Sequence, residues 1–216
     1  MSTVYDCSVP ADRAAGLAAA AGAVRSGRLV VLPTDTVYGI GCDAFDAAAV
    51  RALLEAKGRG PDMPVPVLVG SWTTIDGLVL GVPRQARALI EAFWPGGLSL
   101  VLPHAPSLAW DLGHTRGTVM LRMPLHPVAL ELLRDVGPMA VSSANKSGFP
   151  PAGTAQEAWD QLGEEVGVYL DGGPATENIA STIVDLTGPE PVVLREGAVA
   201  VAEVSEVLGV EVEVGR

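Results

Sequence analysis

The sequence is poor in cysteine, aromatic side chains and positive charge, and each shortage disfavours a class of protein. Its two cysteines, Cys7 and Cys42, lie far apart, with no CxxC pair and no histidine at ligand spacing. This pattern argues against a zinc site or a disulfide framework. Lysine and arginine number 14 against 25 acidic residues, a net charge of −11, which disfavours a large sequence-independent grip on nucleic acid. A local basic pocket remains compatible with this balance.

Long apolar runs are missing as well. No run of about 18 apolar residues predicts a membrane span, and no basic region followed by an apolar stretch and a cleavage site opens the chain. We therefore expect no membrane association and a reducing, cytoplasmic location. The 216 residues are 49% hydrophobic and 18% charged, which is ample material for a packed core. With no linker or repeat in sight, we expect one domain over residues 1–216.

Helix and strand patterns alternate along the chain. Apolar spacing and end signals predict helices at 11–26, 47–56, 83–93, 127–135, 154–162 and 199–208. Short apolar runs predict strands at 29–32, 65–69, 98–102, 118–123, 139–142, 168–170, 182–186 and 192–194. The intermixed order predicts an α/β fold, and the consecutive strands near the C-terminus favour a mixed sheet over a parallel one.

Three polar stretches are candidates for binding. Residues 33–41 follow a predicted strand and gather two threonines, an aspartate, a tyrosine and two glycines in one expected loop. The alternative is a turn in which Asp35 and Thr36 bond their own backbone. Lys57-Gly58-Arg59 ends a predicted helix and suits an anion, although cations also favour helix C-termini for dipole reasons. Residues 142–148 suit a nest for anionic oxygens or an ordinary polar turn.

Arg122 lies inside a predicted apolar strand and therefore needs a partner, because an unpaired buried charge costs several kcal/mol. The partner is either a bound anion or a local carboxylate such as Asp185. The sequence contains neither a GxSxG nucleophile signature nor a GxxxxGK[ST] phosphate loop.

Several short motifs follow one another in a fixed order that resembles the YrdC-like family of threonylcarbamoyl-AMP synthases. The resemblance runs from about Leu29 to Gly197, and the chain ends soon afterwards, like the short form of the family. The motifs are Pro33-Thr34-Asp35-Thr36-Val37-Tyr38-Gly39, Lys57-x-Arg59, Pro64 before an apolar strand, Trp94-Pro95-Gly96, Arg122-Met123-Pro124, Ser143-x-Asn145, Ser181-Thr182-Ile183-Val184-Asp185 and Arg195-x-Gly197.

The resemblance implies a fold and a reaction. The implied fold is a twisted, mixed open sheet flanked by helices around a concave cavity. The implied enzyme is an ATP-dependent nucleotidyltransferase that makes L-threonylcarbamoyl-AMP and diphosphate from L-threonine, bicarbonate and ATP. This is the first step of N6-threonylcarbamoyladenosine modification of tRNA. Mg²⁺ would accompany ATP, and a tRNA threonylcarbamoyl transferase would act downstream.

The resemblance also implies roles for particular residues. Those expected to line a threonine pocket are Thr36, Leu68, Arg122, Ser143 and Ser181. Those expected to face ATP are Lys57, Arg59, Asn145 and Arg195, together with Met63 through its backbone or packing; Lys57 and Arg59 are the expected catalytic pair. The position of Met63 often carries Lys or Asn in relatives, and Gly60-Pro61 stands where a proline usually follows the basic pair.

Two other functions remain as alternatives. The same fold can serve an RNA-binding module, although the net charge of −11 and the lack of a basic stripe with interleaved aromatics weigh against it. The other alternative is a paralogue that keeps the nucleotide cavity and acts on a different carbamoyl compound. We expect no tight binding of tRNA by this chain alone.

Overall fold

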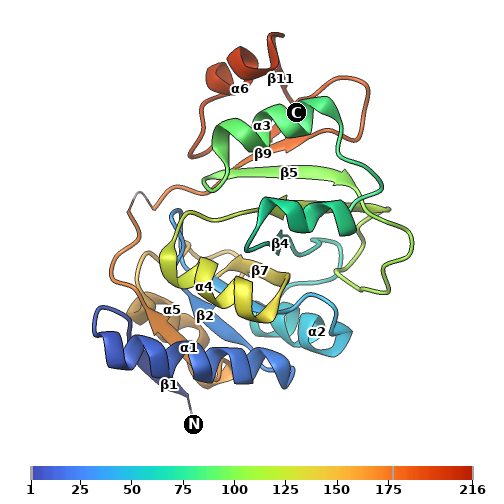
Figure 1. The fold of residues 1–216 in the computed structure, drawn as a ribbon. Helices are drawn as coiled ribbons and strands as arrows, with labels where there is room; N and C mark the ends of the chain where they lie inside the picture. The colour runs from blue at the N-terminus through green and yellow to red at the C-terminus, as the bar shows by residue number, and fades with distance from the viewer. Residues whose placement is uncertain (1, 177, 216) are drawn as a thin grey trace.

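The strands of the protein join edge to edge in one mixed sheet (Figure 1). The computed structural model describes residues 2–176 and 178–215. The order across the sheet is β1-β8-β2-β3-β7-β4-β6-β5-β9-β10-β11. Pairs such as β2–β8 and β5–β9 are parallel, whereas β2–β3, β3–β7 and β5–β6 are antiparallel. The predicted mixed α/β sheet is thereby confirmed, while its extent as one domain over the whole chain stays a prediction.

The elements have the following bounds. The helices are α1 (Pro10–Arg25), α2 (Ala47–Ala56), η1 (Trp72–Gly77), α3 (Arg84–Phe93), α4 (Pro127–Val136), α5 (Ala155–Leu162), η2 (Gly163–Glu165) and α6 (Val201–Leu208). The strands are β1 (Thr3–Asp6), β2 (Val30–Leu32), β3 (Gly39–Asp43), β4 (Val67–Leu68), β5 (Leu98–Pro103), β6 (Thr118–Arg122), β7 (Met139–Ser143), β8 (Val168–Asp171), β9 (Thr182–Asp185), β10 (Val192–Arg195) and β11 (Glu213–Val214).

The helix-end signals of the sequence act as predicted. The Asp46 carboxylate caps α2 by accepting hydrogen bonds from the backbone N–H groups of Ala48 and Ala49, which satisfies donors that the first turn leaves free. Gly27 follows α1 with a φ of +70°, a left-handed conformation that glycine adopts without steric cost. These local signals explain why the six predicted helices lie within a few residues of the observed ones.

Residues 39–41 were expected to be part of a loop, and this prediction was wrong. Residues 39–43 form a strand between β2 and β7. A Cβ on Gly39 or Gly41 would lie 2.6 or 2.8 Å from a methyl of Val141 on β7. The glycines therefore permit close contact between two strands. Because glycine is more typical of turns than of strands, the sequence pattern did not predict a strand here.

Helices cover both faces of the sheet. On one face α1 and α4 lie side by side and pack on Val30, Leu32 and Met139 (Figure 1). Neighbouring strand residues such as Val31 and Ala140 point the other way, into a core that includes residues of α2, α3, α5 and α6. This alternation places Leu68 and Val141 on the same face as α1 and α4, and that face carries the site described next.

Candidate active site

A cavity of about 250 Å³ opens on the sheet face shared with α1 and α4. Strands β3 to β7, β9 and β10 all contribute to it, so residues from 34 to 195 meet there. The sequence-predicted residues that line it are Thr36, Arg59, Leu68, Arg122, Ser143, Ser181 and Arg195. The fold therefore brings seven of the ten predicted site residues to one place. Lys57, Met63 and Asn145 lie outside this lining.

Arg122 is the most constrained cation of the cavity. It is 7% exposed, and its guanidinium donates to the Asp35 carboxylate at 2.6 Å, to Thr36 Oγ1 at 2.8 Å and to the Gly96 carbonyl at 2.9 Å. Asp35 Oδ1 also accepts from the backbone N–H of Leu125 at 2.9 Å. Three of the five N–H donors of the guanidinium are thus committed, and the orientation of Arg122 is fixed before any ligand binds.

Asp35, and not Asp185, is the carboxylate that pairs with Arg122. The sequence offered Asp185 as a possible partner, but Asp185 Oδ1 accepts from the backbone and hydroxyl of Thr187 instead. The turn contacts that were predicted for Asp35 and Thr36 are made by another residue. It is Thr34 whose hydroxyl accepts from the backbone N–H of Thr36 at 3.2 Å and of Val37 at 3.3 Å, which leaves Asp35 free to reach Arg122.

Arg195 and Ser181 form a second polar group in the cavity. The Arg195 guanidinium donates to the Ser181 carbonyl at 2.8 Å and to its hydroxyl at 3.2 Å. The Ser181 hydroxyl lies 2.9 Å from that of Ser99, a buried residue on β5. The sequence motifs did not include Ser99, although a serine between Leu98 and Leu100 in an otherwise apolar strand is the signal that points to it.

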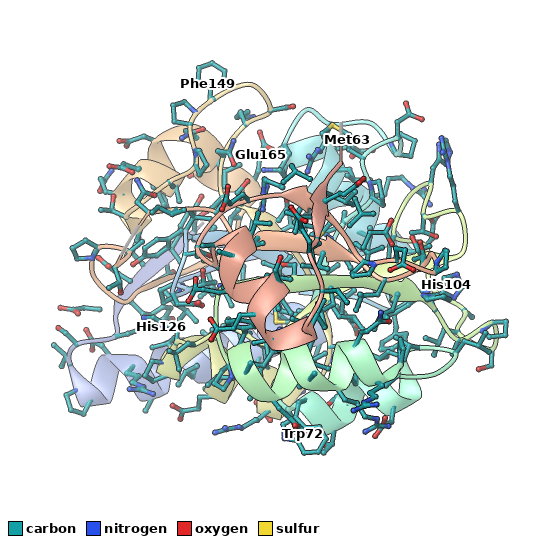
Figure 2. All side chains as sticks on the ribbon, turned by 90° about the horizontal axis from the view of Figure 1, so that it is seen from above. Met63, Trp72, His104, His126, Phe149 and Glu165 are labelled. Carbon is teal, nitrogen blue, oxygen red and sulfur yellow. The ribbon has the colours of Figure 1, made fainter. Side chains whose placement is uncertain are left out.

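Arg59 reaches the cavity from the loop after α2. Its guanidinium donates to Ser142 Oγ at 3.3 Å, and its Nε lies 3.3 Å from the sulfur of Met63. Met63 is 50% exposed and lies at an edge of the molecule (Figure 2). Its side chain therefore contacts Arg59 at Nε without lining the cavity.

The apolar wall of the cavity was only partly predicted. Leu68 was expected, while Met120 and Ile183 also line it. Both stand in predicted strands, at positions that alternate with core-facing Leu121 and Val184. The two-residue period of a strand therefore predicts that Met120 and Ile183 lie on the sheet face opposite to these core residues. It does not predict which face of the sheet carries the cavity, because that depends on how the whole chain packs.

The side chains that line the cavity are positively charged, whereas the chain as a whole is acidic. Arg59, Arg122 and Arg195 contribute three guanidiniums, and the part of the lining that the structure describes contains no carboxylate. Burial lowers the pKa of each of these arginines from its usual value, because a low-dielectric site disfavours the charged form. Repulsion from Arg195 adds to this effect on the pKa of Arg122, while Asp35 opposes it. The cavity is suited to anions.

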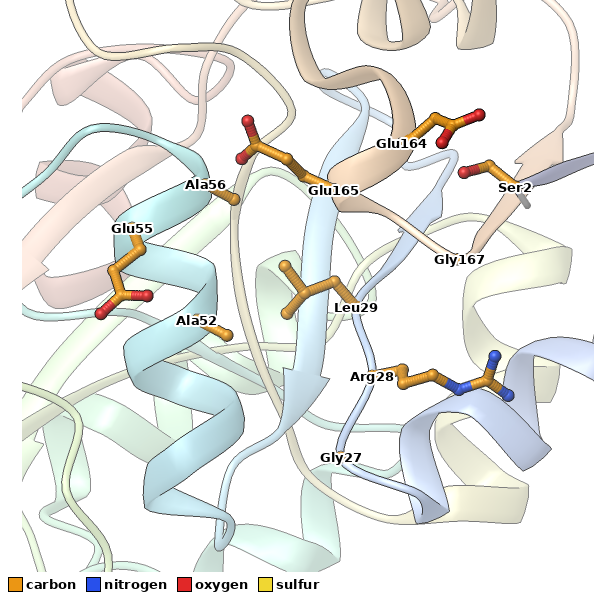
Figure 3. A pocket seen from close by; sticks show the side chains of 10 residues that line it. All are labelled: Ser2, Gly27, Arg28, Leu29, Ala52, Glu55, Ala56, Glu164, Glu165 and Gly167. Atoms are coloured by element: carbon orange, nitrogen blue, oxygen red, sulfur yellow. The ribbon is translucent and has the colours of Figure 1, made fainter.

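A larger hollow of about 550 Å³ lies elsewhere, between α2, residues 27–29 and η2 (Figure 3). Its charged lining consists of Arg28, Glu55, Glu164 and Glu165. Three carboxylates against one guanidinium repel a triphosphate or a bicarbonate ion. The smaller, arginine-lined cavity is therefore the candidate active site.

The structure thus combines an arginine-lined cavity with a mixed α/β sheet, and comparison with known proteins shows the family to which this combination belongs. The Sua5/YciO/YrdC family model, described as "Telomere recombination", matches residues 22–197, and the chain belongs to this family. It is 64% identical over 211 residues to a Mycobacterium tuberculosis protein that carries the provisional name threonylcarbamoyl-AMP synthase, covering 98% of this chain and 97% of that protein. It is 38% identical over 196 residues to threonylcarbamoyl-AMP synthase of Bacillus subtilis, covering 89% and 56%.

Solved structures agree with this assignment. The structure of Pyrococcus abyssi Sua5 complexed with L-threonine superimposes with a TM-score of 0.91 at 34% identity, over 99% of this chain. The present chain spans 63% of the length of that protein. Escherichia coli YciO has the same fold, with a TM-score of 0.82 at 24% identity.

Two features are absent from residues 2–176 and 178–215. No helix among them is long and apolar enough to cross a membrane. No group of three or more His, Cys, Asp or Glu side chains within residues 2–176 and 178–215 is placed to hold a metal ion. Cys7 and Cys42 are buried thiols.

Proposed function

We propose that this protein joins L-threonine, bicarbonate and ATP into L-threonylcarbamoyl-AMP, releasing diphosphate and water. The observation that carries the proposal is a cavity with three guanidiniums and several hydroxyls in an otherwise acidic protein. All three substrates are anionic or carry a carboxylate, and their mutual repulsion must be offset in one place. Membership of the family and the threonine-bound Pyrococcus abyssi relative support the same reaction.

Threonine binds against the wall formed by Arg122, Thr36 and Ser181. The two N–H donors of Arg122 that the protein leaves uncommitted suit the amino-acid carboxylate. Hydroxyls at Thr36, Ser143 and Ser181 can bond the ammonium or the β-hydroxyl, and Leu68 contributes to an apolar wall for the methyl. Such a wall distinguishes threonine from smaller amino acids by its shape.

ATP binds through Arg59 and Arg195, two of the three arginines that line the cavity. The threonine amine captures carbon dioxide, derived from bicarbonate, as a carbamate; a carbamate oxygen then attacks the α-phosphorus, and diphosphate leaves. No covalent bond to the enzyme forms in this scheme, which agrees with the lack of a nucleophile signature. The protein's contribution is to hold the carbamate and phosphate in line and to neutralise charge.

Mg²⁺ enters as part of the MgATP substrate. The cavity lining that the structure describes offers hydroxyls and no carboxylate. Mg²⁺ at nucleotide sites keeps several waters and is bound largely by substrate phosphates, so this lining is compatible with the ion arriving on ATP. On the bound nucleotide it would neutralise phosphate charge, and the arginines of the chain would hold the phosphates.

The product leaves this chain for a second enzyme, a tRNA threonylcarbamoyl transferase, and both act in the cytoplasm. The adenylate is released before tRNA is involved, so tRNA is not needed for its synthesis. With a net charge of −11, the chain alone should bind tRNA no better than about 10⁻⁴ to 10⁻⁶ M at physiological salt.

The test is to incubate the protein with MgATP, bicarbonate and L-threonine and to identify the adenylate by mass spectrometry. Diphosphate release should require every component. Equal release without threonine or without bicarbonate contradicts the proposal. Removing Mg²⁺ with a chelator should abolish the reaction, whereas omission of tRNA should not change it.

The RNA-binding alternative is decided in parallel by titrating labelled tRNA at physiological salt, with and without ATP. Submicromolar affinity that ATP does not alter, or synthesis that begins only when tRNA is added, would favour an RNA-binding protein. Weak binding together with tRNA-independent synthesis supports the synthase.

A further inference from the structure

Lys57 and Arg59 stand two residues apart and point to different places. Lys57 is the first residue after α2, and Gly58 follows with a φ of +64°. The backbone N–H of Arg59 bonds to the Leu54 carbonyl at 2.9 Å, which fixes this tight turn at the helix end. The turn sends Arg59 into the cavity and Lys57 into the protein behind it, where Lys57 is 2% exposed.

The Lys57 ammonium uses all of its hydrogen-bonding capacity inside the protein. Its Nζ donates to the Ser143 carbonyl, to the Asn145 carbonyl at 2.6 Å and to Asn145 Oδ1 at 3.3 Å. An ammonium has three N–H donors and no acceptor, so none is left for a phosphate. Within the described chain it pairs with no carboxylate. A nucleotide could contact Lys57 only by displacing one of these bonds.

Asn145 is committed in the same way. Its Nδ2 donates to the Lys146 carbonyl at 2.9 Å and to the Phe149 carbonyl at 2.7 Å, while its Oδ1 accepts from Lys57. The exchange is reciprocal, because the backbone N–H of Ser147 donates to the Lys57 carbonyl at 2.8 Å. These bonds form a single network between the end of α2 and the loop of residues 143–149.

We infer that Lys57 and Asn145 are positioning residues, which clamp the 143–149 loop so that Ser143 and Arg59 face the substrates. This inference rests on the proposed function and revises the roles that the family resemblance implies, namely direct contacts to ATP. In each of the two motifs, Lys57-x-Arg59 and Ser143-x-Asn145, the two residues therefore have different roles. One member of each motif lines the cavity, and the other member fixes the loop behind it.

The charge of Lys57 suits a clamp. Burial and the nearby Arg59 lower its pKa to about 8, so the amine keeps its proton at neutral pH, where carbonyl oxygens are its partners. Replacing it with methionine preserves much of the volume but removes the Lys57 donor from the Asn145 carbonyl. The Ser143 carbonyl, which also accepts from the backbone N–H of Asn145 at 2.9 Å, loses one of its two donors. Unsatisfied buried carbonyls seek water or new partners, so the loop is expected to loosen while the rest of the fold remains.

The experiment compares Lys57→Met with Arg59→Met in the full-length protein. Hydrogen exchange of the 143–149 amides is measured without any ligand, and kcat and the KM for ATP are measured in adenylate synthesis. We expect Lys57→Met to raise amide exchange in the loop at least about tenfold and to lower kcat about a hundredfold, as misplacement of about 1 Å can do. The KM for ATP should change little. Arg59→Met should raise that KM and leave loop exchange unchanged.

Unchanged loop exchange in Lys57→Met, with a rise in the KM for ATP like that of Arg59→Met, would overturn the inference. If Lys57→Met does not fold, Asn145→Ser decides by the same criteria, because it removes only the amide contacts of the network. Failure of the proposed function is seen separately, since the unmodified protein would then make no adenylate, whereas the exchange comparison needs no substrate.

Discussion

The two hollows of this protein differ in size and charge, and the comparison shows that charge identifies the site. The inner cavity of about 250 Å³ is lined by three arginines and no described carboxylate. The outer hollow of about 550 Å³ carries three glutamates and Arg28. The larger volume is therefore unsuited to the anions that the proposed reaction joins. A protein with 25 acidic and 14 basic residues concentrates much of its buried positive charge in one small place.

The largest expected difference between the two regions concerns stability. Asp35→Ala removes the partner of Arg122, whose side chain is 8% exposed, and should cost about 3 to 5 kcal/mol because a buried charge is left unpaired. Glu165→Ala breaks the pair with Lys146 beside the outer hollow, where the side chains are 46% and 39% exposed, and should cost about 0 to 1 kcal/mol. Urea unfolding of both variants measures the difference. Equal losses would mean that the inner ion pair is not desolvated as the structure has it.

The next largest difference is expected in the rate of adenylate synthesis when one arginine of each hollow is replaced. Arg59→Met removes a guanidinium from the inner cavity and should lower the rate of adenylate synthesis about a hundredfold to a thousandfold. Arg28→Met is the matched control, since Arg28 is exposed and lines only the outer hollow; its rate should stay within about twofold, because surface changes have small effects. Thermal unfolding confirms that both variants are folded. Comparable losses in the two variants would remove the distinction.

A smaller effect tests whether the inner cavity recognises shape as well as charge. Serine lacks the methyl that Leu68, Met120 and Ile183 can contact. A missing methyl in an apolar pocket is worth about 1 to 3 kcal/mol, or roughly 10 to 200-fold in kcat/KM. The measurement is diphosphate release with serine in place of threonine. Equal kcat/KM for both amino acids would show that this wall does not contact the side chain.

The pH dependence of stability gives a further test, and the sign of the effect is fixed. The pKa of Lys57 is lowered from 10.5 to about 8, mainly by burial. Between these two values the unfolded chain binds the proton more tightly than the folded chain, so the contribution of Lys57 to stability rises with pH. The stability of the unmodified protein relative to Lys57→Met should therefore increase from about pH 8 to pH 10, as urea unfolding at several pH values can measure. A constant difference would mean that Lys57 is not desolvated.

Local signals in the sequence were enough for the helices and most strands. Asp46 and Gly27 mark the ends of helices by chemistry that acts within a few residues. The 65–69 run was predicted as a strand, and the observed strand β4 is shorter, Val67–Leu68, in keeping with Pro66, which cannot donate to a sheet. Strands β1 and β11 were missed because they are short edge strands with exposed side chains.

The sequence predicted most of the residues that line the cavity, but it did not predict how they contact one another. Seven of the ten expected residues line the cavity, because the order of the motifs carries that information. The partner of Arg122 is Asp35, 87 positions away in the chain, and no local pattern reveals such a pair. The divergence of Lys57 and Arg59 depends on one left-handed glycine, which the sequence permits but does not require.

The strand order has a consequence for how the protein folds as it leaves the ribosome. Strands β1 and β2 are not neighbours, because β8 lies between them and pairs with both. Strand β1 must therefore wait until residues 168–171 emerge, and Arg195 joins the cavity later still, through the pairing of β10 with β9. Pairings this distant in sequence make folding slow. A nascent chain should accordingly be unable to hold its substrates until nearly all of it has been synthesised.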